Sequence, residues 1–122
     1  MVGMACRLAA KRPVYLIRPV PEHSVNIPDI LYRKFLFQGQ AEDITQPIAS
    51  YYPAHKIAWD AQDRAARECG VKILDPLPFL CKNDICLGSK NGQALYYDGN
   101  HMNEFGNRFL IPMFDPVFDQ KS

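Results

Sequence analysis

The chain has 122 residues, of which 48% are hydrophobic, which suffices for one compact core and is too few for two ordinary domains. Its 14 basic and 13 acidic residues give a net charge of +1 without a basic patch, which excludes an electrostatic footprint for nucleic acid or an anionic membrane surface. No run approaches the roughly 20 apolar residues of a membrane span, and residues 1–10 are too short and interrupted for a signal peptide. We expect a single domain, or part of one, over residues 1–122.

A helix followed by a buried strand is predicted at the start of the chain. Met4, Leu8 and several alanines recur at helical spacing within residues 1–11. Pro13 breaks this pattern ahead of a short apolar run at residues 14–17. The run has the length and composition of a buried strand.

The loop after this strand holds the first candidate binding residues. Pro19 and Pro21 end the strand because neither can donate a hydrogen bond to a sheet. In open α/β sheets ligands bind beyond the carboxyl ends of the strands, so Arg18, Glu22 and His23 are candidates for the rim of a pocket. The alternative for His23 is an exposed, solvated position.

Two helices and a second strand are predicted in the middle of the chain. The first helix covers residues 28–37 and ends at a Gln-Gly-Gln step, and the second begins near residue 47. Gly70 stands where a left-handed cap would end the second helix, and residues 71–74 follow as a β-branched strand. This order of helix, glycine, strand and loop is typical of an α/β layer fold with parallel strands.

The four cysteines fall into two groups. Cys81 and Cys86 flank a polar tetrapeptide that can turn tightly, which favours a disulfide between them and hence an oxidising compartment. Such a short loop would stabilise the fold by about 2 kcal/mol. Zinc is the competing reading, but no second Cys or His pair lies at ligand spacing. Cys6 and Cys69 lie in helical patterns and are predicted to be small buried hydrophobic residues.

The most informative motif is an Asp-x-x-His near the C-terminus. A strand predicted at residues 94–97 leads into Asp98, and His101 follows three residues later. Gly99 and Asn100 favour a turn that folds the carboxylate back towards the imidazole. Such a pair supplies the orienting acid and the general base of an acyl-transfer site, but not the nucleophile. The alternative is that Asp98 only caps a turn.

A helix is predicted after this motif, with Asn103 as its N-cap and Pro112 as the residue that ends or kinks it. Its apolar face consists of Phe105, Phe109, Leu110 and Met113. A metal site formed by Asp98, His101 and Glu104 is a weaker hypothesis, because their spacing spreads the side chains around too wide an arc.

Four segments together resemble a known family: residues 14–22, 70–76, 81–86 and 95–106. In this order they are similar to the second half of an SGNH hydrolase-type domain. They resemble most the periplasmic SGNH domain at the C-terminus of bacterial membrane acyltransferases of family three, which O-acetylate surface polysaccharides. The most specific part is the Tyr-Asp-x-x-His step followed by an aromatic residue and Gly106.

The resemblance implies a three-layer α/β/α sandwich of the SGNH, or flavodoxin-like, type that is incomplete on its N-terminal side. It also implies a serine nucleophile and an oxyanion hole built from Ser, Gly and Asn. Only the Asp-x-x-His element is present, with Asp98 as orienting acid and His101 as general base. The Gly-Asp-Ser block and the Gly and Asn blocks are absent, and no serine here lies on a glycine-flanked turn between a strand and a helix.

The function expected from the resemblance is that of a fragment of an acyltransferase or esterase acting on O-acetyl groups of cell-surface carbohydrate. Its substrate contacts would be Arg18, Glu22 and Tyr97, and no cofactor is expected. The expected location is the periplasmic side of the bacterial inner membrane. The expected partners are an acetylated glycan and either the missing N-terminal half or a membrane acyltransferase domain.

Alone, this chain is predicted to be inactive. It should expose sheet edge and apolar surface, and so be marginally stable or self-associate. The alternative function is a non-catalytic module that binds carbohydrate or a partner at a rim formed by Arg18, Glu22, Tyr96 and Tyr97.

Overall fold

The computed structural model describes residues 2–39 and 42–118. In its N-terminal part the elements are α1 (Val2–Ala9), β1 (Tyr15–Ile17), α2 (Ile27–Gln38), β2 (Thr45–Pro47), η1 (Ile48–Ser50), α3 (Tyr51–Cys69) and β3 (Lys72–Leu74). The C-terminal part contains α4 (Leu77–Leu80), β4 (Cys81–Lys82), β5 (Ile85–Leu87), β6 (Ser89–Lys90), β7 (Gln93–Ala94), α5 (Glu104–Arg108), η2 (Ile111–Phe114) and α6 (Asp115–Phe118). Helices and short strands alternate from α1 to β4, and this mixture is compatible with an α/β fold.

The centre of the fold is a parallel pair formed by β1 and β3. Leu16 lies opposite Ile73, with one residue pair on either side. The pairing continues beyond the strands, because Lys72 N donates to Val14 O and Arg18 N donates to Leu74 O. The two strands that the sequence predicts at residues 14–17 and 71–74 are therefore neighbours in space.

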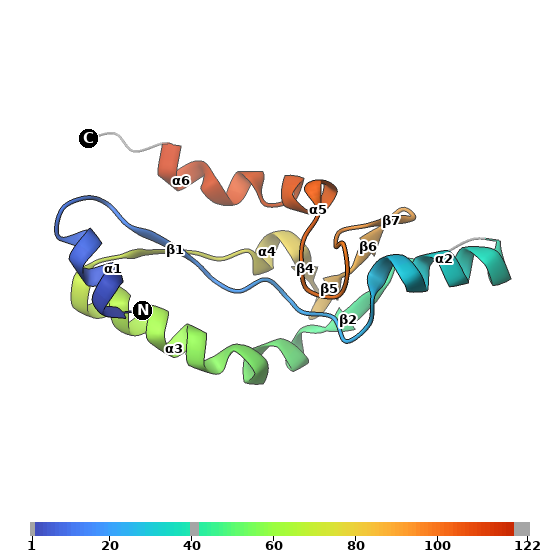
Figure 1. Cartoon of the computed structure of the whole chain (residues 1–122), viewed down its shortest axis with the longest axis horizontal. Coiled ribbons are helices and arrows are strands. Elements are labelled where there is room, and N and C mark those ends of the chain that lie inside the picture. The colour runs from blue at the N-terminus through green and yellow to red at the C-terminus, as the bar shows by residue number, and fades with distance from the viewer. Residues whose placement is uncertain (1, 40–41, 119–122) are drawn as a thin grey trace.

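Helices cover both faces of this pair (Figure 1). On one face Leu16 and Ile73 pack against Ala5 of α1 and Ala65 of α3. On the other face Leu74 belongs to the larger cluster, whose members come from α2, α4 and the C-terminal helices. Successive residues of a strand point to opposite faces, so three-residue strands are enough to join the two clusters.

Two small antiparallel sheets follow the parallel pair, and the sequence did not reveal them. The first has the order β2-β5-β4, and the second pairs β6 with β7. Asn83 and Asp84 both have positive φ in the β4–β5 turn, as do Asn91 and Gly92 in the β6–β7 turn. This conformation is typical of two-residue hairpin turns and suits Asn, Asp and Gly.

Both cysteine pairs form disulfides. Cys81 and Cys86 lie opposite each other in the β4–β5 hairpin and are bonded. Cys6 and Cys69 are also bonded, so the prediction that these two are small buried hydrophobic residues is wrong. Helix α1 packs against α3 and brings their Cα atoms to 5.2 Å, which lies within the range that a disulfide spans.

The C-terminal region differs from its prediction in two ways. The strand expected at residues 94–97 ends at Ala94, and Tyr96 forms only an isolated bridge with Met102. The helix expected from Phe105 to Met113 is divided into α5 and η2, and α6 follows it. Asn103 caps α5, as predicted, by accepting a hydrogen bond from Gly106 N. The helix ends before Pro112, which lies in the first turn of η2.

Within residues 2–39 and 42–118, no helix combines the length and the apolar character needed to cross a membrane.

We expect the two disulfides to differ in their effect on stability. Cys6 and Cys69 are 63 residues apart, whereas Cys81 and Cys86 are 5 apart. On the chain-entropy estimate, opening the first by Cys6→Ser with Cys69→Ser costs about 4 kcal/mol, and opening the second by the matching pair costs about 2 kcal/mol. Urea unfolding of the two double variants measures this order, and a larger loss for the shorter loop would contradict it.

We also expect Gly106 to be intolerant of a side chain. A Cβ at this position of α5 would collide with the Leu95 carbonyl and approach the Met102 side chain to 2.8 Å. Gly106→Ala should therefore lower the free energy of unfolding by about 1–3 kcal/mol. The matched control is Gly3→Ala in α1, where a Cβ meets nothing within 4 Å. That control should be neutral or stabilising by up to about 1 kcal/mol, and equal effects of the two substitutions would refute this packing argument.

Candidate active site

Asp98 and His101 are joined in one compact turn. One carboxylate oxygen of Asp98, Oδ1, accepts hydrogen bonds from the backbone N–H groups of Asn100 at 2.8 Å and His101 at 2.7 Å. The other oxygen, Oδ2, lies 2.8 Å from Nδ1 of the His101 ring. Both oxygens are therefore engaged, and the carboxylate fixes the orientation of the imidazole.

The same contacts determine the charge of Asp98. The hydrogen bonds from the Asn100 and His101 backbones, followed by that from the His101 ring, lower the pKa of the Asp98 carboxyl group from 3.8 to about 2. Asp98 is thus a carboxylate at any pH near neutrality. A carboxylate at Nδ1 favours the tautomer in which Nδ1 carries the hydrogen, and that tautomer leaves Nε2 as a base.

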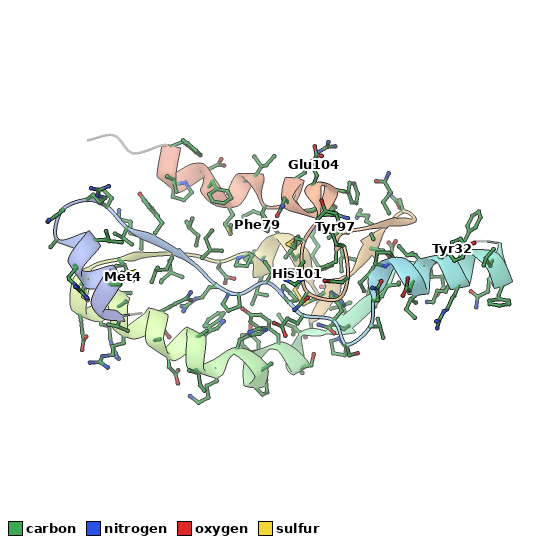
Figure 2. The ribbon with its side chains drawn as sticks, viewed as in Figure 1. Met4, Tyr32, Phe79, Tyr97, His101 and Glu104 are labelled. Atoms are coloured by element: carbon green, nitrogen blue, oxygen red, sulfur yellow. A yellow bond between two sulfur atoms is a disulfide. The ribbon has the colours of Figure 1, made fainter. Side chains whose placement is uncertain are left out.

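His101 is open to the outside of the molecule, with 74% of its side chain exposed (Figure 2). In the described part of the chain no hydroxyl group forms a hydrogen bond with it. Ser50 Oγ donates to the Pro47 carbonyl, and Ser89 Oγ accepts from Ile44 N. The pair is therefore a base with its orienting acid, placed where a further group could approach.

Backbone contacts hold the turn from two sides. Ile27 N donates to the Asp98 carbonyl at 3.2 Å, and His23 N donates to the Gly99 carbonyl at 2.7 Å. These bonds dock the turn on the segment that leaves β1. Tyr97 N donates to the His101 carbonyl at 2.8 Å and closes the turn on itself.

Asn103 ties the end of the turn to the core. Its side-chain amide donates to the Ala94 carbonyl at 2.8 Å, and its backbone N–H donates to the Leu95 carbonyl at 3.0 Å. Its side-chain oxygen accepts from Gly106 N and so starts α5. One residue therefore fixes both the strand before the turn and the helix after it.

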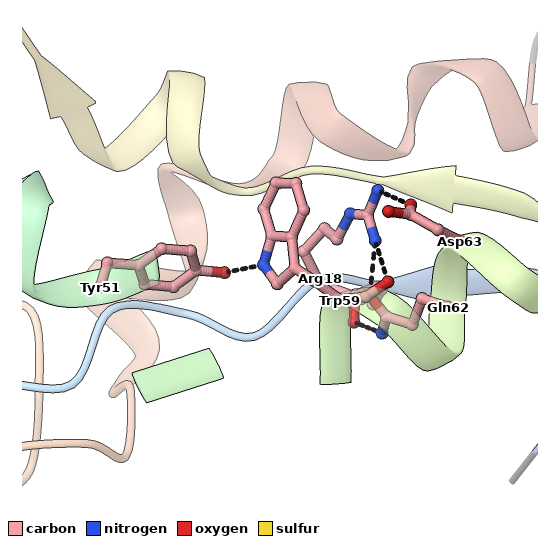
Figure 3. A network of polar contacts seen from close by, with 6 residues as sticks. Arg18, Tyr51, Trp59, Gln62 and Asp63 are labelled. Carbon is pink, nitrogen blue, oxygen red and sulfur yellow. Dashed lines mark hydrogen bonds and ion pairs between the residues drawn. The ribbon is translucent and has the colours of Figure 1, made fainter. Parts of the chain in front are cut away.

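The place of Arg18 after β1 predicts a position at the rim of a pocket, but its side chain is buried. It is only 9% exposed, and its guanidinium stacks over the Trp59 ring at 3.9 Å (Figure 3). Its donors reach the Trp59 carbonyl, Gln62 Oε1 and Asp63 Oδ1. Because its hydrogen bonds go to α3, Arg18 joins β1 to that helix, with the cation–π contact alone contributing about 1–2 kcal/mol.

The other predicted binding residues have different positions. Tyr97 is 69% exposed and directly precedes Asp98 (Figure 2). Glu22 is exposed and lines a cavity of about 470 Å³ beside the start of α3, together with His23, Ser24 and Tyr51. Tyr97 and Glu22 therefore remain available to a ligand.

His23 lines the same cavity as Glu22, and it is buried, so the alternative of an exposed, solvated position is wrong. Only 8% of it is accessible, because the ring packs against Tyr96, which is 73 residues away in sequence. No local pattern reports a contact of that range.

The metal hypothesis gains no geometric support. Glu104 pairs with Arg108 at 3.0 Å, one helical turn further along α5. Across residues 2–39 and 42–118 no group of three or more His, Cys, Asp or Glu side chains is placed to hold a metal ion.

A family model described as SGNH domain (fused to AT3 domains) matches residues 1–116. Neither a curated protein nor a solved structure matches the chain. The match covers all the segments that resemble an SGNH hydrolase-type domain, including the turn that joins Asp98 to His101. The chain belongs to the family of SGNH domains that are fused to AT3 domains.

Proposed function

We propose that Asp98 and His101 are the orienting acid and the general base of a Ser-His-Asp triad in an acyltransferase or esterase domain. The single observation that carries this proposal is the 2.8 Å contact between Asp98 Oδ2 and His101 Nδ1, in a turn whose other carboxylate oxygen is held by two backbone amides. The family supports acyl-transfer or ester-hydrolysis chemistry of this type. The substrate class that we propose is O-acetyl groups on cell-surface carbohydrate.

In this mechanism His101 Nε2 takes the proton of a serine hydroxyl as the serine oxygen attacks the acetyl carbonyl. The resulting imidazolium then protonates the leaving alcohol. In the second half-reaction Nε2 takes a proton from the acceptor, a sugar hydroxyl or water, as the acceptor oxygen attacks the carbonyl of the acetyl-serine. The imidazolium then returns that proton to the serine oxygen as the bond between serine and the acetyl group breaks. Asp98 stays ionised throughout and stabilises the imidazolium.

In the proposed arrangement, residues outside this sequence supply the serine and the oxyanion donors. Each oxyanion donor would contribute about 3–4 kcal/mol to the stabilisation of the tetrahedral intermediate. Helices pack on both faces of the β1–β3 pair, which supports a three-layer α/β/α sandwich. In the complete domain, further parallel strands would extend this sheet. An N-terminal half of the domain, or an acyltransferase domain in the membrane, is the partner that we propose.

Two surface residues are proposed to contact the substrate. Tyr97 presents an exposed ring next to Asp98, and an aromatic ring suits the apolar face of a sugar. Glu22 offers carboxylate acceptors for sugar hydroxyls at the cavity beside α3. Two disulfides suit an oxidising compartment, so we place the domain on the periplasmic side of the inner membrane.

A second candidate function is carbohydrate or partner binding without turnover. The observation that favours it is that no hydroxyl among the described residues bonds to His101. Titration of the chain with acetylated and plain oligosaccharides separates the two functions, since a binder saturates without releasing acetate.

We expect His101→Ala and Asp98→Asn to lower acetyl turnover by about 10²–10⁴-fold in the polypeptide that joins this domain to the serine. The matched control is Glu104→Gln, which removes another exposed carboxylate three residues from His101 and should leave turnover unchanged. Release of acetate from an acetylated oligosaccharide is the measurement. Full turnover by His101→Ala would exclude the proposed base, and an equal loss in Glu104→Gln would favour the metal hypothesis.

We also expect a characteristic pH dependence of the turn. The folded-state pKa of Asp98 is about 2, below its ordinary value of 3.8, so the contribution of its carboxylate is present above pH 4 and is lost between pH 4 and about pH 2. The amide resonances of Asn100 and His101 should therefore shift with a midpoint near pH 2 in an NMR titration of this chain. A midpoint near the ordinary value would show that the turn does not form in solution.

A further inference from the structure

His23 has an unusual environment for a residue in a loop. Its ring lies edge-on to that of Tyr96, with the centroids 4.9 Å apart and an angle of 66° between the planes. Among the described residues, Nε2 of His23 is the buried side-chain polar atom without a hydrogen-bond partner. The ring also forms a hydrogen bond with the backbone of Leu87. The ring is thus fixed by a ring contact to Tyr96 and a hydrogen bond to Leu87.

The charge state of His23 fits this packing. Burial lowers the pKa of the imidazole from 6.5, and the hydrogen bond to the Leu87 backbone opposes that shift less strongly. A neutral ring can remain against the Tyr96 ring, whereas a charged one would pay for desolvation. His23 is therefore suited to packing and not to exchange of protons with a substrate.

The backbone of the same segment holds the Asp98–His101 turn. His23 N and Ile27 N donate to the carbonyls of Gly99 and Asp98, as described above. The approach is so close that a Cβ on Gly99 would lie 2.5 Å from the His23 carbonyl oxygen and 2.8 Å from that of Val25. The turn and residues 23–25 therefore pack so closely that position 99 requires glycine.

The geometry points to His23 as a positioning residue for the acid–base pair. Its ring anchors residues 21–27 to Leu87 and Tyr96, and the backbone of these residues holds Asp98 and Gly99 in place. A second contact supports the anchor, because Tyr96 Oη donates to the Pro21 carbonyl at 2.9 Å. This inference rests on the proposed function of the turn, since His23 itself contacts no reacting group.

The test is amide hydrogen exchange, followed by NMR, of this chain and its His23→Ala variant. We expect exchange at Ile27, Asn100 and His101 to accelerate at least tenfold in the variant. Exchange at Arg18, whose N–H bonds to the Leu74 carbonyl in the β1–β3 pair, should not change. The matched control is His55→Ala in α3, which removes a histidine ring that lines the same cavity but packs against Tyr51, and which should leave the turn amides unchanged.

Two conservative variants separate the ring from its hydrogen bond. His23→Asn keeps a side chain that can form hydrogen bonds, and His23→Phe keeps a ring against Tyr96. Rescue of slow turn exchange by either variant identifies the contact that anchors the segment. A merely structural role predicts instead a uniform acceleration at Arg18 and at the turn, with parallel loss of global stability.

Gly99→Ala keeps His23 intact and disrupts the close packing of the turn against the carbonyl groups of His23 and Val25. It should produce the same selective acceleration at Ile27, Asn100 and His101, and it serves as the test if His23→Ala does not fold. Unchanged turn exchange in the folded variants, or a uniform change across the chain, would overturn the inference. A failure of the proposed function would appear differently, as no acetate release by the unaltered polypeptide while the exchange pattern persists.

Discussion

The parallel pairing of β1 with β3 is the constraint on which the rest of the structure depends. Each strand has only three residues, yet their two faces join the α1–α3 cluster to the larger core. The pairing also fixes where the chain leaves β1. From that point Arg18 binds to α3, and residues 21–27 run across to meet the Asp98–His101 turn. Residues 18–27 thus form a short, continuous connection between these strands and the site.

The site itself combines strong local bonds with weaker long-range ones. Within the turn, Asp98 satisfies two amides and a ring nitrogen through contacts at most three residues away. The residue types of this turn are ones that favour an Asx turn. The placement of the turn depends instead on His23, Ile27 and Asn103, which connect it to the segment after β1 and to the core. The local contact with Asp98 orients the His101 ring, and the tertiary contacts determine where the turn lies in the fold.

Much of the fold could be predicted from sequence because several signals are local. Helical periodicity and Gly70 located α3 and its left-handed cap, and the β-branched runs located β1 and β3. The turn between Asp98 and His101 followed from Asp-Gly-Asn chemistry. Spacing alone also suggested the short Cys81–Cys86 loop.

The features that sequence did not reveal depend on contacts between distant segments. Cys6 and Cys69 are 63 residues apart, and nothing in helical periodicity indicates that α1 and α3 pack side by side at those positions. Strand β2 contains Pro47 and has no alternating pattern, so its pairing with β5 is set by the hairpin it meets. The loop after β1 does contribute Glu22 and His23 to a cavity, but the tertiary partners that bury Arg18 and His23 are not visible in the sequence.

The central claim is that Asp98 prepares His101 as a base at Nε2. The most direct measurement is the tautomeric state of the neutral His101 imidazole, read from the two ring-nitrogen chemical shifts in a long-range proton–nitrogen NMR spectrum at alkaline pH. We expect a single tautomer with hydrogen on Nδ1 and an unprotonated Nε2, which Asp98→Asn should convert to a mixture. Hydrogen on Nε2, or a mixture already present in the unaltered chain, would contradict this claim.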